Sequence, residues 1–548
     1  MINNINITVM GEKKEVSKTT TYLELSKLYQ NKFKNPIIVA RQNGHYKELN
    51  DKIEQQGDIE FFDYNEREAN RIYLNGLVYI TIYAFKELFG GNIRVKHSID
   101  KGLYIETDIS IDEEKVFRLR DKMQELVSMN LPIQKINVDR LDAIKYFEDI
   151  GDKSKVGLMK YNTNTYVTLY KLGNMYNFFF SYMPLSTGVL TSFDIKYLSE
   201  NGFVLLFPTV YMNNVIKEYE HHPKIFEVFG EYHNWAKLMN IDNSYSLNEF
   251  VSSGNIGNLI RMDEMLQSNK LLDVAKEIYY KRDNIKIVLI AGPSSSGKTT
   301  TCNKLSMFLK SFGMTPHTVS MDDYFLDREM TPKKEDGSYD FEALEAVDLE
   351  LFDTQMKELL DGKDVLMPIF NFLLGQQEFK KRLKLGKDDI LIIEGIHGLN
   401  PNILTSIPSE NKYKIYISPL TGLNLDNHNR MSTTDNRLLR RIVRDNRTRG
   451  HSVTDTIEGW PSVREGEEKY IFPYQDEADC VFNSALIYEL GVLKTYVEPL
   501  LYSVDTSSEY YHEAKRLINM LKMFLPIPSE DIPSDSLLRE FIGGSCFK

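Results

Sequence analysis

The sequence has no run of apolar residues close to the ~18 that a membrane-spanning helix needs. Its first residues, MINNINITVMGEKKEV, lack the charged and then apolar segments that mark a signal peptide. Cysteine is scarce, and Cys302, Cys480 and Cys546 are odd in number, far apart and without CxxC spacing. This excludes a disulfide framework and a zinc ribbon. These absences predict a cytoplasmic protein of a reducing compartment, with no membrane partner.

The length of 548 residues is several times the ~150 of an average domain, so three or four domains are expected. Hydrophobic residues make up 42% and charged residues 26%, which are ordinary proportions for globular proteins. Disorder, collagen and coiled coil are therefore excluded as overall descriptions. The net charge of −12 disfavours a protein coated in nucleic acid, although a local basic patch near residue 440 is compatible with it.

The spacing of apolar residues divides the chain into five segments. Residues 1–63 predict a small α+β unit of ubiquitin-like size, and residues 66–225 predict a second α+β domain that opens with a long helix. Residues 226–282 predict a helical connector. From 283 to 500 strands and helices alternate, which is typical of a parallel sheet with crossover helices. Residues 501–548 form a tail with one predicted helix.

The strongest motif is GPSSSGKT, which fits G-x-x-x-x-G-K-[ST] between a predicted strand and a predicted helix. Such a loop turns successive backbone N–H groups towards phosphates, while Lys298 supplies a mobile positive charge and the Thr299 hydroxyl can hold Mg²⁺. An accidental Gly/Ser-rich turn is the alternative, which the flanking elements disfavour. The residues predicted to bind a nucleotide cofactor here are Gly292, Pro293, Ser294, Ser295, Ser296, Gly297, Lys298, Thr299 and Thr300.

Two carboxylates follow predicted strands of the same domain. The strand HTVSM leads to Asp322, and the strand ILIIE ends at Glu394. The carboxyl ends of parallel strands form the ligand crevice of such a sheet, so both side chains are expected to face the phosphates. We predict Asp322 to be a general base and Glu394, with Thr299, to hold Mg²⁺ directly or through water. A helix N-cap or solvated Asp pair, and a plain strand-end Glu, are the alternatives.

The segment NRLLRRIVRDNRTRGH carries Arg437, Arg440, Arg441 and Arg444 at helical spacing, so several of them share one face. Guanidinium groups over a phosphoryl-transfer site neutralise developing charge and exclude water. We predict that Arg437 and Arg441 take part in catalysis alongside Lys298 and that Arg444 binds the nucleotide. A solvated charged helix or an RNA-contacting face is the alternative.

The motifs GPSSSGKTT, DDYF, YDFEALEAVD, MPIFNF, IIEGIHGLN and RLLRRIVRDNRTRGH together resemble the uridine kinase and phosphoribulokinase family of P-loop kinases. The resemblance covers about residues 285–490. It implies ATP and Mg²⁺ as cofactors, activation of an acceptor hydroxyl by Asp322 and an arginine-rich lid over ATP. It also implies that Asp340 contacts the ribose of a nucleoside acceptor and that Phe370 and Phe372 line the pocket for its base.

Two departures concern the acceptor. Uridine kinases usually have Tyr at the position of Phe370 and a base-contacting His at the position of Gly375. The segment TGLNLDNHNRMSTTDN, residues 421–436, also has no counterpart in the simplest uridine kinases. The 5′-hydroxyl of a uridine- or cytidine-type nucleoside is the expected acceptor, and another sugar or sugar phosphate is the alternative.

Residues 1–63 resemble a TGS domain, and residues 66–225 resemble the editing-type domain of threonyl-tRNA synthetases, with KELFG and GLYIETDI as landmarks. In that family one helix carries an HxxxH pair, and the matching positions here are Asn75 and Tyr79. An amide and a phenol cannot replace two imidazoles as ligands or bases at pH 7. Editing chemistry is therefore predicted to be lost, and kinase chemistry is predicted not to need this half. RNA binding, ligand sensing and homo-oligomer formation stay open, as does an RNA-binding regulator switched by ATP.

Overall fold

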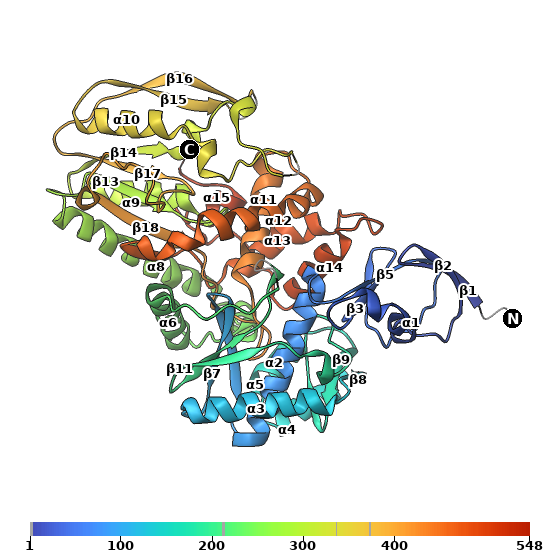
Figure 1. Ribbon diagram of the computed structural model, residues 1–548. Coiled ribbons are helices and arrows are strands. Elements are labelled where there is room, and N and C mark those ends of the chain that lie inside the picture. Colours follow the sequence, from blue (N-terminus) through green and yellow to red (C-terminus); the bar gives the residue numbers. More distant parts are fainter. Residues whose placement is uncertain (1–3, 211–213, 336, 372–373, 548) are drawn as a thin grey trace.

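The computed structural model describes residues 4–210, 214–335, 337–371 and 374–547. Figure 1 shows three bodies: a small blue sheet at the N-terminus, a cyan to green region below the centre, and a larger yellow to red region above it. The expected combination of α+β units with a C-terminal α/β unit is confirmed.

The N-terminal unit is a five-stranded sheet with one helix. Its elements are β1 (Asn4–Val9), β2 (Glu12–Ser17), α1 (Tyr22–Tyr29), η1 (Gln30–Lys32), β3 (Val39–Gln42), β4 (His45–Lys47) and β5 (Gly57–Phe62). The strand order is β2-β1-β5-β3-β4, with β1 parallel to β5 and antiparallel to β2. Ile5, Ile7 and Val9 alternate along β1 and are all buried, as the period of two predicts for a strand with one buried face.

The second unit is organised around one long helix, α2 (Arg67–Phe89). The Glu66 carboxylate caps its start, and Gly90 ends it in the left-handed region at φ 69°, which glycine adopts without steric cost. The remaining elements are β6 (Ile93–Ile99), β7 (Gly102–Thr107), α3 (Glu113–Met129), β8 (Gln134–Asp139), α4 (Arg140–Asp149), α5 (Lys153–Lys160), β9 (Tyr166–Leu172), β10 (Met175–Asn177), η2 (Thr187–Val189), β11 (Asp194–Ser199) and β12 (Gly202–Leu206). They form the sheets β11-β12-β7-β6 and β10-β9-β8.

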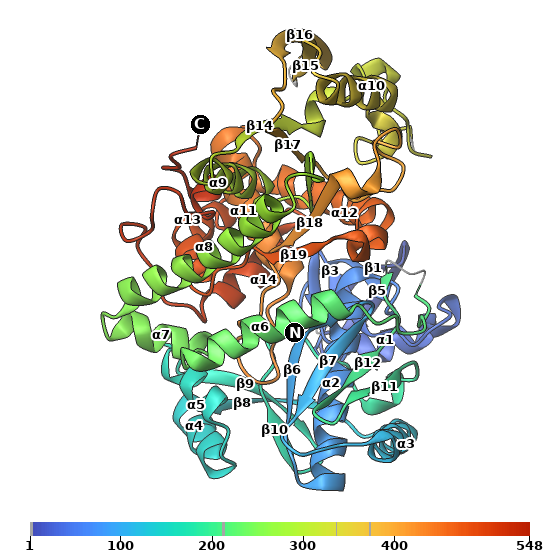
Figure 2. The ribbon, with the colours of Figure 1, turned by 90° about the vertical axis from the view of Figure 1, so that its left-hand side faces the viewer.

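Three helices follow where the sequence predicted a connector, namely α6 (Pro223–Leu238), α7 (Ser244–Ser252) and α8 (Ile256–Tyr280). In Figure 2, α6 lies between the upper and lower regions. Phe229 of α6 stacks its ring on His97 of β6 at a centroid distance of 3.7 Å. The same phenylalanine belongs to a buried cluster with Ala291 and Tyr416. The connector is therefore part of the packing between the two halves.

The C-terminal unit contains a five-stranded parallel sheet of order β14-β17-β13-β18-β19. Its elements begin with β13 (Ile287–Ala291), α9 (Lys298–Ser311), β14 (Thr315–Ser320), η4 (Met321–Tyr324), η5 (Arg328–Met330), η6 (Leu344–Ala346), α10 (Leu349–Leu360), β15 (Val365–Asn371), β16 (Gln376–Leu383) and β17 (Asp389–Glu394). They continue with η7 (Ser409–Asn411), β18 (Lys412–Ser418), α11 (Thr433–Thr448), α12 (Val453–Tyr470), η8 (Phe472–Glu477), β19 (Cys480–Asn483) and α13 (Glu489–Leu501). β15 and β16 form a separate antiparallel hairpin.

The tail contains α14 (Tyr511–Leu521) and the short α15 (Arg539–Ile542). One helix was expected here. α14 packs on α13, and α15 packs on α11. Phe541 is fully buried, and the guanidinium of Arg440 lies over its ring. The second helix therefore returns to the region of the phosphate loop.

Residues 421–436, named here the docking segment, join the C-terminal unit to the second unit. The Lys155 ammonium of α5 donates to the Asp426 carboxylate at 2.9 Å, and both side chains are at most 1% exposed. The Asn427 carbonyl accepts the N–H of Val95 on β6, and the Asn424 amide donates to the Val95 carbonyl. The segment without a counterpart in simple uridine kinases is thus the contact with the synthetase-like unit.

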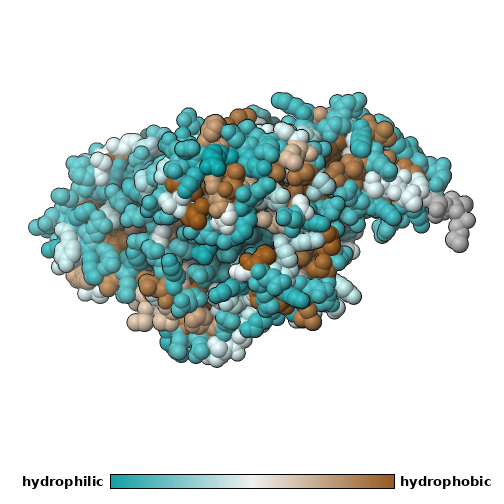
Figure 3. All heavy atoms as spheres, turned by 90° about the horizontal axis from the view of Figure 1, so that it is seen from below, coloured by the Kyte–Doolittle hydropathy of each residue, from teal (hydrophilic) through white to brown (hydrophobic). Residues whose placement is uncertain are grey.

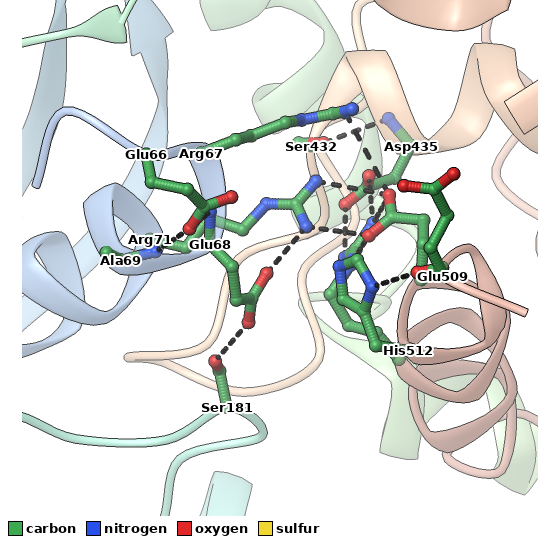
Figure 4. A network of polar contacts seen from close by, with 12 residues as sticks. Glu66, Arg67, Glu68, Ala69, Arg71, Ser181, Ser432, Asp435, Glu509 and His512 are labelled. Carbon is green, nitrogen blue, oxygen red and sulfur yellow. Dashed lines mark hydrogen bonds and ion pairs between the residues drawn. The ribbon is translucent and has the colours of Figure 1, made fainter. Parts of the chain in front are cut away.

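Charged side chains from α2, α14 and α11 form a second contact between the halves (Figure 4). Arg71 of α2 donates to Glu513 of α14 at 2.7 Å. Arg516 of α14 donates to Glu513 and, at 2.6 Å, to Asp435 of α11. Because these groups are largely buried, each carboxylate relies on its guanidinium partners for compensation.

His512 lies beside this network, and its ring nitrogen and the carboxylates of Glu68 and Glu513 come within 4.8 Å of one another. Both carboxylates already pair with Arg71, at 2.9 and 2.7 Å. We interpret the group as an ion-pair network, since a bound cation would have to displace that guanidinium.

The face seen in Figure 3 is mainly hydrophilic, with hydrophobic residues in small separate groups. Within the described residues, no helix combines the length and the apolar character needed to cross a membrane.

Candidate phosphoryl-transfer site

The segment GPSSSG forms the loop between β13 and α9. Gly292 packs so closely on β18 that a Cβ would lie 2.0 Å from the Ile417 carbonyl oxygen. Gly297 has φ +89°, and a Cβ there would lie 2.7 Å from Leu537. Ser295 also has a positive φ of 61°. The two glycines are therefore required by close packing and backbone conformation.

The Lys298 ammonium lies over the loop and donates to the carbonyl oxygens of Gly292 at 3.0 Å and Pro293 at 3.4 Å. Thr299 is exposed, whereas Thr300 is buried. The hydroxyls of Ser295 and Ser296 are buried and have no hydrogen-bond partner among the described residues. The loop thus presents one mobile cation and unpaired donors, which is the donor set that a polyphosphate needs.

Asp322 lies in the single 3₁₀ turn that follows β14. Burial raises the pKa of its carboxyl, and the charges of Lys298, Arg449 and Arg444 oppose this shift. No described residue donates a hydrogen bond to this carboxyl group. The neighbouring Asp323 differs, because its carboxylate accepts the backbone N–H of Phe370 at 3.3 Å. Asp322 is therefore the carboxylate of the pair that stays available to a ligand.

Glu394 is the last residue of β17, the strand between β13 and β14. In the sheet it lies opposite Ile290 of β13 and Ser320 of β14. The Ser320 hydroxyl donates to its carboxylate at 3.1 Å. Burial and the charge of Asp322 raise the pKa of Glu394 to about 7, and Lys298 opposes this rise. The predicted meeting of strand-end carboxylates beside the phosphate loop is thus present in the fold.

Glu342 is a site residue that the sequence analysis missed. Burial and the charge of Glu467 raise the pKa of its carboxyl to about 7, while Arg441 and Lys298 lower it. It belongs to the motif YDFEALEAVD, which was used only for its resemblance. The fold brings Glu342 close to Lys298 of the phosphate loop. No local spacing in the sequence indicates this contact.

Arg437 and Arg440 of α11 are at most 1% exposed. Arg437 pairs with Glu467 and donates from Nε to the Ser294 carbonyl oxygen at 2.9 Å. Arg440 pairs with Glu489 and donates to the Ser295 carbonyl at 3.4 Å. Both guanidinium groups therefore stabilise the backbone of the phosphate loop through its carbonyl oxygens. A direct catalytic role for Arg437 stays a prediction.

The other arginines of α11 lie around Asp445. Arg441 donates to the Ser294 hydroxyl at 2.9 Å and pairs with Asp445 at 3.1 Å. Arg444 pairs with the same carboxylate at 2.9 Å. Arg449, which the sequence analysis did not single out, lies 3.6 Å from it and acts on the charge of Asp322. The Asp445 carboxylate thus pairs with three guanidinium groups near Asp322, the candidate base.

The predicted acceptor residues lie between η6, α12 and the β15–β16 hairpin. Asp340 accepts a hydrogen bond from the Tyr470 hydroxyl at 3.1 Å. The buried Phe370 ring meets Phe325 edge to face at 5.8 Å. Phe372 lies outside the described residues. Gly375 has φ +69° and packs on Arg328, so a histidine at this position would be strained.

The C-terminal tail reaches the loop through Glu540 of α15. Its carboxylate accepts hydrogen bonds from the backbone N–H of Thr300 at 3.2 Å and from the Thr300 hydroxyl at 2.8 Å. The first turn of the helix after a phosphate loop normally offers these donors to a nucleotide. Asp535 of the same tail pairs with Lys304 of α9 at 3.2 Å. An anionic side chain of the protein thus holds two of the predicted nucleotide donors.

The parallel sheet, the loop after its central strand and the carboxylates at the neighbouring strand ends define a P-loop phosphotransferase domain. Residues 287–487 match the model of the "Phosphoribulokinase / Uridine kinase family". The resemblance expected for the C-terminal region is confirmed.

A curated relative also covers only part of the chain. The uridine kinase of Borrelia duttonii (strain Ly) is 28% identical over 228 residues, which cover 39% of this chain and 97% of that protein. A solved structure described as that of a possible uridine kinase from Bacillus stearothermophilus is 19% identical and covers 39% of this chain and 98% of its own, with a TM-score of 0.27.

The N-terminal part is similar to the threonine–tRNA ligase of Halalkalibacterium halodurans, at 28% identity over 206 residues. This similarity covers 36% of the present chain and only 32% of the ligase.

At the positions of the expected histidine pair, Asn75 lines a cavity. The Tyr79 hydroxyl donates to the Tyr170 and Met175 carbonyl oxygens at 2.7 and 2.8 Å. Tyr79 therefore holds the β9–β10 hairpin together.

Proposed function

We propose that the C-terminal domain transfers the γ-phosphoryl group of ATP to a hydroxyl of a nucleoside, with the 5′-hydroxyl of uridine or cytidine as the preferred acceptor. The observation that carries this proposal is the convergence of Lys298, Asp322 and Glu394 at one edge of the sheet, beside the glycine-rich loop. The similarity to uridine kinases over nearly their whole length supports the acceptor class.

The donor set fits ATP with Mg²⁺. Thr299, exposed at the start of α9, and Glu394 would hold the metal ion, which supplies charge neutralisation between the phosphates when bound. The loop amides, with the hydroxyls of Ser295 and Ser296 near them, would bind the phosphate oxygens. Lys298 would leave its contacts with the Gly292 and Pro293 carbonyls and pair with the phosphates, because a polyanion is the stronger partner.

The chemical step needs an acceptor oxygen in line with the transferred group and a base to take its proton. Asp322 suits the second role, since its carboxyl has no competing hydrogen bond among the described residues and lies among cations that oppose the rise of its pKa. Arg441 of α11 donates to the Ser294 hydroxyl and would offset the charge that develops on the phosphoryl oxygens. Arg444 would bind the nucleotide from the same helix.

The acceptor would lie between Asp340 and Phe370. An aromatic ring beside a carboxylate suits a ribose and a base, because the carboxylate can accept from sugar hydroxyls while the ring contacts the planar base. Gly375 removes the usual histidine contact to the base, so another sugar or sugar phosphate is the second candidate acceptor.

A panel of acceptors tests the proposal. The full chain is incubated with Mg²⁺, γ-labelled ATP and, in turn, uridine, cytidine, adenosine, ribose and ribulose 5-phosphate. Labelled uridine or cytidine monophosphate is the expected product. Transfer only to a sugar or sugar phosphate would replace the acceptor, and tight tRNA binding with no transfer to any acceptor would favour the RNA-binding regulator instead.

A further inference from the structure

A cavity of about 730 Å³ lies between the synthetase-like unit and the kinase-like domain. Its walls come from α2 and β6 on one side and from the docking segment, α11, α12 and α14 on the other. The volume is typical of sites that enclose a small molecule. Asn75 and Arg437 both line it, so the cavity touches the former editing position and the helix that braces the phosphate loop.

The arginines that line the cavity differ in their partners. Five of them lie within 4.0 Å of a carboxylate, and these are Arg67, Arg71, Arg437, Arg464 and Arg516. Arg430, in the docking segment, has no ion pair and no hydrogen bond to any described residue. Burial lowers the pKa of Arg430 to about 10, and the charge of Asp435 offsets this only in part. The side chain is therefore still charged at neutral pH, and it is only partly exposed.

An unpaired charge in such surroundings is unfavourable unless an ion of opposite sign accompanies it. Next to Arg430 the 16-residue helix α11 begins, and its first residues, Thr433 and Thr434, line the same cavity. The positive end of a helix adds to the attraction for an anion. A guanidinium and a helix N-terminus side by side favour a phosphate group, which can accept from both.

The rest of the cavity suits an organic body attached to that anion. Leu74 and Val78 of α2, Phe180, Phe207 and Phe229 contribute apolar surface. Aromatic and aliphatic surface is usual in a site for a small organic ligand. Charged side chains of both signs, among them Lys101, Lys217 and Glu468, line the rest of this cavity.

We propose that this cavity binds a free phosphorylated small molecule of nucleotide size, with its phosphate at Arg430 and the N-terminus of α11. Arg440 and Arg441, which contact the phosphate loop, do not line this cavity, and the site is separate from the proposed catalytic function. Because Arg437 lines the cavity and also donates to the Ser294 carbonyl oxygen, its occupant contacts the helix that positions the loop.

Calorimetric titration with UMP, AMP and inorganic phosphate tests the proposal. The titrations use the full chain carrying Lys298→Ala, so that the phosphate loop contributes little, and then the same chain with Arg430→Gln added. At least one of the two nucleotides should bind to the first protein, and Arg430→Gln should weaken that binding at least tenfold. Arg261→Gln, which changes an exposed arginine of α8 that pairs with Asp531, is the matched control and should leave the affinity unchanged.

Two further measurements separate lost binding from lost folding. Asn75→Phe should fill the cavity and abolish nucleotide binding, while circular dichroism confirms that all variants are folded. Hydrogen exchange should slow in the first turn of α11 when the nucleotide is added. Unchanged affinity in folded Arg430→Gln, binding that disappears with Lys298→Ala alone, or binding of unacylated tRNA without either nucleotide would each overturn the proposal. None of these outcomes depends on phosphoryl transfer, so the proposed function is tested separately.

Discussion

Helix α2 begins the second unit and helix α9 follows the first strand of the C-terminal unit. The two helices differ in how many of the chemical residues predicted by the resemblances they carry. α9 begins with Lys298, Thr299 and Thr300 directly after a loop that packs as a phosphate loop must. α2 is capped at both ends, but it carries Asn75 and Tyr79 where the synthetase resemblance requires histidines. One region has the residues that its resemblance predicts for a site, and the other has the helix without the histidine pair that its resemblance would require.

The comparison shows that a fold constrains function only through particular residues. It also explains what the second region now contributes. Tyr79 has become a structural side chain in the β9–β10 hairpin, and β6 and α5 bind the docking segment of the kinase-like domain. The synthetase-like region therefore acts as a support for the segment that leads into α11.

The largest effect is expected from Asp322→Asn in the catalytic region. Loss of the general base should lower kcat by ~10²–10⁴, with ATP affinity little changed, measured as phosphoryl transfer and nucleotide titration. Asp323→Asn is the matched control on the same turn and should lose less than about tenfold, because that carboxylate contacts the Phe370 amide. Equal losses of ATP affinity and turnover in Asp322→Asn would make it a metal or structural residue instead.

The second test addresses the join between the two regions. Lys155→Met leaves the Asp426 carboxylate buried without its cation, which should cost about 3–5 kcal/mol of unfolding free energy. Lys160→Met, on the same helix, breaks an exposed pair with Glu249 and should cost less than about 1 kcal/mol. Urea denaturation measures both. Adding Asp426→Asn to Lys155→Met should recover part of the loss, and equal stability of the two lysine variants would show that the docking segment is not anchored there.

A smaller effect concerns pH. The carboxylates of Asp100 and Asp476, one from each region, lie beside the His222 ring and raise its pKa to about 9. A raised histidine pKa stabilises the folded chain fully below the unfolded value near 6.5, and this contribution disappears as the pH rises through 9. We expect about 1–2 kcal/mol to be lost between pH 7 and 10, after allowance for solvent screening.

The readout is thermal unfolding as a function of pH. His222→Gln should flatten the dependence in this window, while His221→Gln, which changes the exposed neighbour bonded to Tyr219, should leave it as in the wild type. A pH profile that His222→Gln does not alter would show that the two regions are not held together through this ring.

The smallest effect is expected at Glu540. Its carboxylate accepts from both donors of Thr300, so an incoming nucleotide must displace an anion. Glu540→Gln should raise nucleotide affinity by roughly threefold to tenfold, since an amide competes less well than a carboxylate for the same N–H and hydroxyl. Glu530→Gln in the same tail is the control. Weaker nucleotide binding in Glu540→Gln would show that the tail completes the site instead of covering it.

The kinase half was largely predictable because its signals are local. A glycine-rich loop between a strand and a helix, and carboxylates at strand ends, follow from chain order and from the rule that parallel strands end at one edge. The arginines of α11 were recognised as a group for the same reason. Their division into Arg437 and Arg440 behind the loop and Arg441 beside it depends on packing against Glu467 and Glu489, which lie far away in sequence.

The remaining features are non-local. Glu540 meets Thr300 across 240 residues, and Lys155 meets Asp426 across 271, so no spacing in the sequence predicts either contact. The expectation that the kinase half needs nothing from residues 1–225 also arose from local motifs alone. The buried ion pairs between the halves give those residues a structural role that a reading of motifs could not reveal.

The most direct test of the account is transfer of the γ-phosphoryl group from labelled ATP to uridine by the full chain, compared with its Lys298→Ala variant. We expect labelled UMP from the wild-type chain and a loss of at least ~10² in rate from the variant, because a positioned donor to developing charge contributes that much. Label transfer to uridine at the same rate by a folded Lys298→Ala chain, or no transfer to any nucleoside by the wild type, would contradict the assignment of the C-terminal domain as a nucleoside kinase.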